Sequence, residues 1–235
     1  MNKLYFEAII CACTTKHSDI FSIAFEKLRE YVPFKTLHLV VPDEDWQHFY
    51  NQYKNNRMLI LYKDSQFISS KLNEYIKNKL GKRKGMYGWY IQQLIKIKLS
   101  SNFEDMDNIL IWDSDTIPLR PLNFIRNDGE FNYYYGSEFH KPYFNTLKKI
   151  LGVDKAPPHS FIAQCFPLKS MLAKDFIKNV DESYWMEKII DNLDQSSDCA
   201  FSEYESLGNF ILTKKDVNFI NFPWERNGVV HLYKF

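Results

Sequence analysis

Hydrophobic and polar positions along the first half of the chain predict strands and helices in turn. Residues 5–13, 37–41 and 58–62 are short apolar runs, which is typical of strands that are buried on both faces. Residues 17–31 carry apolar side chains at helical spacing, and a second helix is expected to start near Asp43. Strands of this kind separated by helices predict an α/β fold with a mostly parallel sheet flanked by helices.

The pattern continues through the second half without an internal repeat or a linker. Residues 88–99 form a strongly amphipathic segment, and residues 109–112 read as a compact buried strand. Further helices are expected at 169–180, 184–193 and 202–213, and further strands at 131–135, 160–166 and 217–222. We therefore expect one domain that spans residues 1–235.

The composition excludes several classes of protein. The 235 residues are 45% hydrophobic and 25% charged, with a mean hydropathy of −0.39, as in a globular chain with one core. No apolar run approaches the roughly 20 residues that span a bilayer, and no signal-peptide pattern opens the chain, so a cytoplasmic location is expected. The four cysteines include no Cys-x-x-Cys pair, which argues against a zinc module, and Cys11 and Cys13 are expected in a buried strand.

The net charge of +1 conceals two oppositely charged segments. Residues 71–98 contain eight Lys or Arg and one acid, whereas residues 181–206 contain eight acids and one Lys. Within the first, the basic cluster at 77–84 has three interpretations: a loop that closes over a diphosphate, a peripheral contact with an anionic membrane, or a solvated loop. A nucleic-acid partner is not expected, because the basic residues lack interleaved aromatic side chains.

Two aspartates follow the buried strand 109–112 directly. Asp113 and Asp115 would lie beyond its carboxyl end, where open α/β sheets bind ligands. Carboxylates one residue apart suit Mg²⁺ or Mn²⁺, which bind one or two such groups together with substrate phosphates. An EF-hand is disfavoured by Ile117 and Pro118 at its fifth and sixth positions. The alternative is a pair of solvated loop residues.

The order of five segments resembles a known family. Asp113-Ser114-Asp115 after an apolar strand resembles the DxD motif of nucleotide-sugar glycosyltransferases of the GT-A fold, and more closely the bacterial DUF6492-type putative glycosyltransferases. The segments are GWYIQQLIKIKLSS (88–101), ILIWDSDTIPLRPL (109–122), HKPYF (140–144), SFIAQCF (160–166) and SEYESLGNF (202–210). The resemblance implies a single GT-A-like, Rossmann-like domain, with a nucleotide-sugar-binding half (1–125) and an acceptor-binding half (126–235).

The resemblance also implies an activity. The chain would move a sugar from a nucleoside-diphosphate sugar, with UDP-sugars favoured, to a glycan or lipid-linked glycan acceptor in bacterial surface polysaccharide synthesis. Mn²⁺ or Mg²⁺ would be the cofactor, with Asp115 as a direct ligand and Asp113 on the metal, the ribose or both. His231 is a candidate third ligand, since several retaining families bring a late histidine back to the metal. Thr14 and Thr15 would meet the base and ribose.

Two further groups of residues are candidates for the site. Gln93 and Lys96 lie on the helix before the aspartates, where Lys96 could orient Asp113, meet a phosphate or simply be a surface lysine. Ser202 and Glu205 have the spacing of a capping box, which favours a structural role for Glu205. Glu203 is then expected to point outward from the first helical turn and to be the catalytic carboxylate.

Two other functions remain open from the sequence. Phosphatases of the haloacid-dehalogenase type also use Asp-x-Asp at a strand end, although usually near the N-terminus. A non-catalytic module that binds sugar nucleotides could keep the same fold without turnover.

Overall fold

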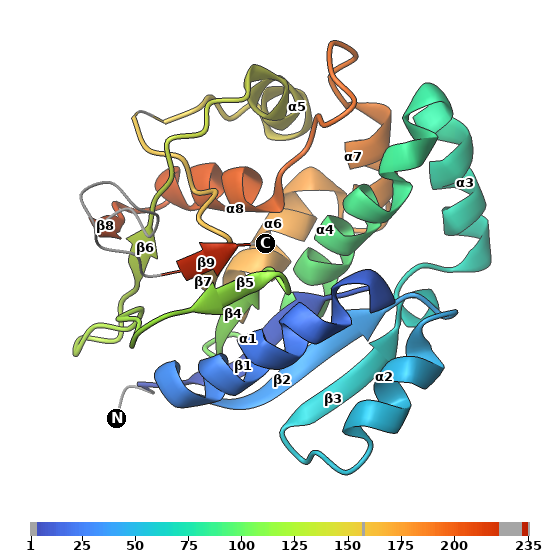
Figure 1. Ribbon diagram of the computed structural model, residues 1–235. Coiled ribbons are helices and arrows are strands. Elements are labelled where there is room, and N and C mark those ends of the chain that lie inside the picture. Colours follow the sequence, from blue (N-terminus) through green and yellow to red (C-terminus); the bar gives the residue numbers. More distant parts are fainter. Residues whose placement is uncertain (1–3, 157, 221–231, 235) are drawn as a thin grey trace.

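The centre of the molecule is a five-stranded sheet in the order β3-β2-β1-β4-β7 (Figure 1). The computed structural model describes residues 4–156, 158–220 and 232–234. Strands β1 to β4 are parallel, and β7 joins β4 in the antiparallel direction. The strands are β1 (Phe6–Ala12), β2 (Phe34–Val41), β3 (Leu59–Lys63), β4 (Asn108–Trp112) and β7 (Cys165–Lys169). The predicted α/β class with a mostly parallel sheet is confirmed.

Helices cover both faces of this sheet (Figure 1). On one face α1 packs on α2, with an edge-to-face contact of Phe21 and Phe49 at 6.4 Å between ring centroids. Strands β1, β2 and β3 are added toward one edge of the sheet, whereas β4 is added on the other side of β1. This change in the direction of strand addition places α4 on the opposite face, beside α6 and α8. These helices are α1 (Ser18–Tyr31), α2 (Trp46–Tyr53), α4 (Tyr87–Ser100), α6 (Ser170–Asp181) and α8 (Glu203–Leu212).

Shorter elements complete the described part of the chain. Two pairs of short strands lie beside the main sheet, β5 with β9 antiparallel and β6 with β8 parallel. The remaining elements are β5 (Thr116–Pro118), β6 (Asn132–Tyr134), β8 (Asn218–Ile220), β9 (Leu232–Lys234), α3 (Ser70–Leu80), α5 (Lys141–Leu151), α7 (Trp185–Asp191) and the 3-10 turns η1 (Thr15–His17), η2 (Asp64–Gln66) and η3 (Gly81–Met86). None of the helices in these ranges is long and apolar enough to cross a membrane.

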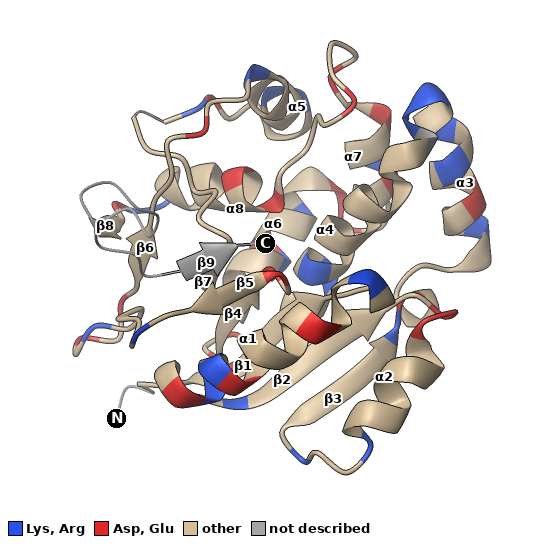
Figure 2. Cartoon of the chain, viewed as in Figure 1, with Lys and Arg blue, Asp and Glu red and all other residues tan. Residues whose placement is uncertain are grey.

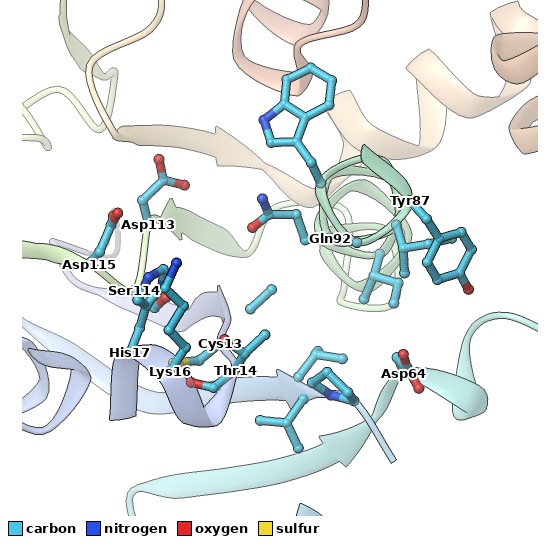
Figure 3. Close-up of a pocket in the computed structure, with 18 of the residues that line it drawn as sticks. Cys13, Thr14, Lys16, His17, Asp64, Tyr87, Gln92, Asp113, Ser114 and Asp115 are labelled. Atoms are coloured by element: carbon cyan, nitrogen blue, oxygen red, sulfur yellow. Dashed lines mark hydrogen bonds between the residues drawn. The ribbon is translucent and has the colours of Figure 1, made fainter. Parts of the chain in front are cut away.

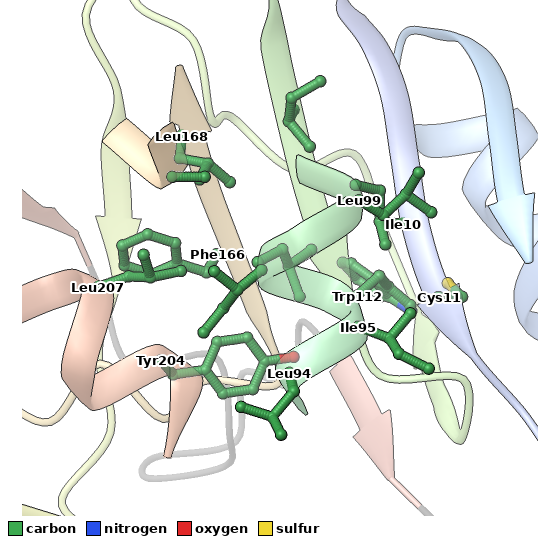
Figure 4. Close-up of a cluster of buried hydrophobic side chains, with 14 of the residues drawn as sticks. Ile10, Cys11, Leu94, Ile95, Leu99, Trp112, Phe166, Leu168, Tyr204 and Leu207 are labelled. Carbon is green, nitrogen blue, oxygen red and sulfur yellow. The ribbon is translucent and has the colours of Figure 1, made fainter. Parts of the chain in front are cut away.

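The main core lies between the sheet and α4 (Figure 4). Leu94 and Leu99 of α4 are both buried, and Phe166 of β7 lies between α4 and α8. Each large apolar side chain removed from water in this way contributes about 1.5–3 kcal/mol. Trp112 is fully buried at the end of β4, and its indole N–H donates to the carbonyl of Thr116 at 2.9 Å. This anchoring fixes the loop that follows β4.

One strand expected from the sequence needs correction, and two helices were not predicted. Residues 160–164 do not form a strand: they make a turn, and β7 begins only at Cys165. The polar segment 70–80 is a helix, α3, whose lysines mask its apolar positions. Residues 141–151 are also a helix, α5, although their helical apolar spacing was visible in the sequence. The helix expected from Asp43 starts at Trp46.

The oppositely charged segments contact each other (Figure 2). Lys79 forms an ion pair with Asp191 at 2.8 Å, and the Tyr75 hydroxyl donates to the same carboxylate. Arg83 is buried, donates to the backbone carbonyl of Asp194 and lies 4.0 Å from Asp198. The basic cluster is therefore helical, formed by the end of α3 and by η3, and part of its charge is balanced by carboxylates of the acidic segment.

Candidate active site

A cavity of about 680 Å³ lies at the carboxyl ends of β1, β2 and β4, beside the first half of α4 (Figure 3). Its floor is apolar, with Val40, Val41, Ile91 and Ile95 among the lining residues. Polar groups stand at its two ends: Figure 3 places Asp113, Ser114 and Asp115 at one and Asp64 and Tyr87 at the other, with Gln92 between them. This is the edge at which open α/β sheets bind ligands. We call it the larger cavity.

The two aspartates lie in the tight loop between β4 and β5. The Asp113 backbone N–H donates to Gln164 at 3.0 Å, and the Thr116 N–H returns to the Asp113 carbonyl at 3.0 Å. Because the buried strand and these bonds fix the backbone, both carboxylates are presented at the cavity. They could hold a divalent cation of the kind that takes one or two carboxylates and completes its shell with substrate phosphates and water. The described ranges contain no group of three or more His, Cys, Asp or Glu arranged to hold a metal, so these two carboxylates would have to be completed by other ligands.

Lys96 lies between two carboxylates. Its Nζ is 2.6 Å from Oδ1 of Asp113 and 3.0 Å from Oε1 of Glu203, and its side chain is only 2% exposed. The Tyr204 hydroxyl also donates to Oδ1 of Asp113, at 2.7 Å. Burial alone would lower the pKa of Lys96, but the two carboxylates outweigh it and raise that pKa above its ordinary value. Of the three interpretations of Lys96, the structure supports the one in which it orients Asp113. The interpretation of Lys96 as a surface lysine is wrong, because its side chain is buried.

Glu203 points inward, which corrects the expectation that it points outward. Ser202 caps α8 by accepting the N–H of Glu205 at 3.3 Å, and this start of the helix turns Glu203 toward α4. The Glu203 N–H donates to Oε1 of Gln93 at 3.0 Å, and Gln93 is itself held by the Trp89 carbonyl. Burial raises the pKa of Glu203 above its ordinary value, although Lys96 acts in the opposite direction.

Glu205 has the structural role expected for it, but through different contacts. Its carboxylate accepts from the Ser160 hydroxyl at 2.6 Å, from the Phe161 N–H at 3.2 Å and from the Asn209 amide at 2.8 Å. Lys155 lies 3.4 Å from it. Only the half of the capping box that Ser202 supplies is present, because the carboxylate instead fixes the 160–164 turn against α8.

A second, smaller cavity of about 160 Å³ adjoins the first. Trp89, Gln92 and Asp113 line both cavities. Glu203 and Gln164 line only the smaller one, in addition to Gln93, Lys96, Glu138, Tyr143 and Tyr204. Sequence reasoning missed Gln164, because its segment was predicted to be a strand, and it missed Trp89, which belongs to an apolar helical pattern. We call this space the smaller cavity.

The remaining predicted residues have different positions. Thr14 lines the larger cavity, with Lys16 and His17. Thr15 is not among the lining residues: its N–H and hydroxyl both bind the Asp45 carboxylate, at 2.9 Å each. His231 lies outside the described residues. The buried Cys11 and Cys13 have the core position predicted for them, and burial raises the pKa of the Cys13 thiol to about 12.

A pair of carboxyl groups marks the far end of the larger cavity. Asp64 follows β3, and Asp43 follows β2, where it accepts hydrogen bonds from the N–H and hydroxyl of Ser65. Burial, followed by the proximity of Asp43, raises the pKa of Asp64 to about 6, whereas hydrogen bonds lower that of Asp43. Glu44 lines the same end, and burial raises the pKa of Tyr87 there to about 12.

Two solved structures illustrate what this chain is similar to. Mouse xyloside xylosyltransferase 1 matches with a TM-score of 0.51 over 98% of this chain and 97% of that one, at 10% sequence identity. The galactosyltransferase LgtC, solved with donor and acceptor sugar analogues, matches with a TM-score of 0.49 over 91% and 73% of the two chains, at 14% identity. The xylosyltransferase match confirms the fold class expected for the chain, a GT-A-like α/β domain.

The sequence also matches a family. Residues 5–226 match the family described as "Family of unknown function (DUF6492)", and the chain belongs to it. This confirms the family that the sequence segments pointed to. No curated protein matches the sequence.

Proposed function

We propose that the chain is a metal-dependent glycosyltransferase. It would move a sugar from a nucleoside-diphosphate sugar, with UDP-sugars favoured, to a glycan or lipid-linked glycan acceptor in bacterial surface polysaccharide synthesis. The observation that carries the proposal is the pair Asp113 and Asp115 at one end of a cavity of about 680 Å³. That volume is in the range of cavities that bind small molecules and cofactors.

The two ends of the larger cavity suit the two ends of a nucleotide. Asp115 and Asp113 would hold Mn²⁺ or Mg²⁺ at the diphosphate, with His231 proposed as a further ligand. When bound, the metal would neutralise charge on the departing diphosphate. The nucleoside would lie on the apolar floor of the cavity, where Thr14 and its neighbours after β1 would contact it. A location at the cytoplasmic face of a membrane, in peripheral contact with anionic lipid, belongs to the same proposal.

Glu203 is the proposed general base. Its carboxylate lies in the smaller cavity next to Asp113, and burial raises its pKa, which brings a carboxylate closer to the proton affinity that base catalysis needs at neutral pH. It would take the proton of the acceptor hydroxyl while that oxygen bonds to the sugar and the nucleoside diphosphate leaves. Lys96 and Gln93 would hold Glu203 and Asp113 in place through the contacts described above.

Nucleotide binding tests the proposal directly. Thermal unfolding would be followed with UDP, GDP, CDP and their sugar conjugates, each with Mn²⁺ or with EDTA. A ligand at 100 times its Kd adds about 2.7 kcal/mol to the free energy of unfolding, which should raise Tm by about 5–10 °C.

The variant Asp115→Ala should lose the part of this increase that depends on metal. The exposed Asp216→Ala is the matched control and should keep it. Equal stabilisation in EDTA and in Asp115→Ala would contradict the metal role. Binding without donor hydrolysis or transfer to any acceptor would instead favour a non-catalytic module.

A further inference from the structure

Gln164 has an unusual backbone conformation. Among the described residues other than glycine, it alone has a positive φ, at 63°. This left-handed region is sparsely populated by residues with a Cβ, is favoured by glycine and is tolerated best by Asn and Asp. Backbone strain of this kind is found preferentially at functional sites.

The backbone geometry at Gln164 does not require a glutamine. The residue ends the 160–164 turn, and its carbonyl accepts the Asp113 N–H at 3.0 Å. The next residue, Cys165, is already paired with Trp112 in the sheet. The left-handed turn thus connects the loop of Asp113 to β7, and a glycine would make the same backbone bond without strain. The turn itself therefore places no demand on the chemistry of the side chain.

Gln164 lines the smaller cavity and not the larger one. The smaller cavity has about a quarter of the volume of the larger, which suits a monosaccharide ring better than a nucleoside. Trp89 and Tyr143 stack at 6.3 Å between ring centroids at its wall, and the Glu203 carboxylate stands opposite Asp113 across Lys96. Aromatic faces together with hydrogen-bonding groups are the surface that a sugar ring needs.

We propose that Gln164 is a specificity-determining residue, whose side-chain amide hydrogen-bonds a hydroxyl group of the transferred sugar in the smaller cavity. The inference rests on the proposed function. The chemistry of the amide supports the role: carboxylates such as Glu203 can only accept, the Lys96 ammonium can only donate, and an amide can do both. It can therefore distinguish hydroxyl groups by their position on the ring, as a site built to pair a substrate hydroxyl does.

Two variants separate this role from a purely structural one. Gln164→Gly removes the amide and the backbone strain, whereas Gln164→Ala removes the amide and keeps the strain. Binding of UDP and GDP, and of UDP-glucose, UDP-galactose and GDP-mannose, would be measured by calorimetry with Mn²⁺, and Tm would be measured without ligand.

Both variants should keep the wild-type affinity for the free nucleoside diphosphate within about twofold. Both should lose about 3- to 10-fold in affinity for the preferred sugar nucleotide, which corresponds to one neutral hydrogen bond. The ratio of the affinities for UDP-glucose and UDP-galactose should fall toward one. Gln164→Gly should also have a Tm no lower than that of the wild type and higher than that of Gln164→Ala.

The failures are distinguishable. If diphosphate and sugar nucleotide lose affinity by the same factor in both variants, or if neither does, Gln164 has no role in sugar recognition, while the proposed function stands. If the wild-type chain binds no nucleotide with or without metal, the proposed function is wrong and this inference with it.

Discussion

Lys96 holds the charge balance of the candidate site. Its ammonium is 2% exposed, and Glu203 is 5% exposed, so neither charge is compensated by water to a useful extent. Asp113, at 18%, is partly open to the cavity. A buried cation between two carboxylates contributes little net stability compared with apolar residues, but removal of one member leaves uncompensated charge behind. We therefore expect Lys96 to be required for both the fold of the site and the position of Asp113.

Replacement of Lys96 by Met should lower the free energy of unfolding by about 3–5 kcal/mol, because two carboxylates then face each other without a counter-charge. Urea denaturation would measure the change. Lys98→Met is the matched control on the same helix, two residues away and not among the residues that line either cavity, and it should change stability by less than about 0.5 kcal/mol. The double variant Lys96→Met/Glu203→Gln should recover part of the loss. Additive effects of the two changes would contradict the coupling.

Asp64 should make stability depend on pH. Its pKa in the folded chain is about 6, against an ordinary value near 4, so between these values the folded state binds the proton more tightly than the unfolded state. The unfolding free energy therefore falls as pH rises from about 4 to about 6. Asp43, whose pKa is lowered, acts in the opposite direction and at lower pH, where its contribution is lost as pH falls. Glu44, Lys63 and Tyr87 are the other titratable groups that face the pair.

The variant Asp64→Asn should remove this dependence. Near pH 4 it should unfold at about the wild-type temperature, because a neutral carboxyl and an amide are then similar. Toward pH 8 it should have the higher Tm, because the ionised Asp64 of the wild type is partly buried and is also repelled by Asp43. Thermal unfolding at half-unit pH steps measures the difference. The exposed Asp216→Asn should show no such trend, and a Tm difference that stays constant from pH 4 to pH 8 would rule out the role of Asp64.

At the scale of elements, α8 has a tight contact with the 160–164 turn. A Cβ placed on Gly208 would lie 2.1 Å from the ring of Phe161, which is itself fully buried. Together with the bonds from Glu205 to Ser160 and to the Phe161 N–H, this close approach fixes the turn that presents Gln164. The contact explains why a glycine stands in the middle of a buried helix, where its intrinsic helix propensity is poor.

Two helical glycines should respond in opposite directions to replacement by Ala. Gly208→Ala gains helix propensity but overpacks the Phe161 contact, and should lower the free energy of unfolding by about 1–3 kcal/mol. Gly88→Ala, on α4, meets no atom within 4 Å and should raise it by roughly 0.5–1 kcal/mol. Chemical denaturation of both variants decides the matter. Stabilisation by Gly208→Ala would show that the Phe161 ring and the 160–164 turn can shift to accommodate the added methyl group at little cost.

The same elements show what the sequence could predict. The spacing of apolar residues alone identified β1, β2, β4 and α4, because buried strands and an amphipathic helix have distinct hydrophobic patterns. The position of Asp113 and Asp115 followed from the end of β4. The inward turn of Glu203 and the antiparallel β7 did not follow, because they depend on contacts between segments about 110 and 55 residues apart, such as Glu203 with Gln93 and Trp112 with Cys165. Such contacts leave no local signal.

At the scale of the whole molecule, the two charged segments connect the two halves of the chain. The basic and acidic segments contact each other directly: Lys79 pairs with Asp191, and Arg83 reaches the loop after α7. These contacts hold α3 and η3, which precede α4, against the acidic segment that precedes α8. Because α4 carries Lys96 and α8 carries Glu203, the contacts help to fix the spacing of the two helices at the site.

Arg83 should therefore matter for stability much more than its basic neighbour Lys82. Arg83→Met keeps the length of the side chain but loses its charged hydrogen bond to the Asp194 carbonyl inside the molecule, and should cost about 2 kcal/mol of unfolding free energy. Lys82 is exposed, and Lys82→Met should change it by less than about 0.5 kcal/mol. Urea denaturation at low salt and at 1 M NaCl would test both variants. The Arg83 effect should persist at high salt, because buried contacts are screened much less than surface charges. An equal, small and salt-sensitive effect of both changes would mean that the segment is held only by surface charge, and that the helices of the site are positioned by the core alone.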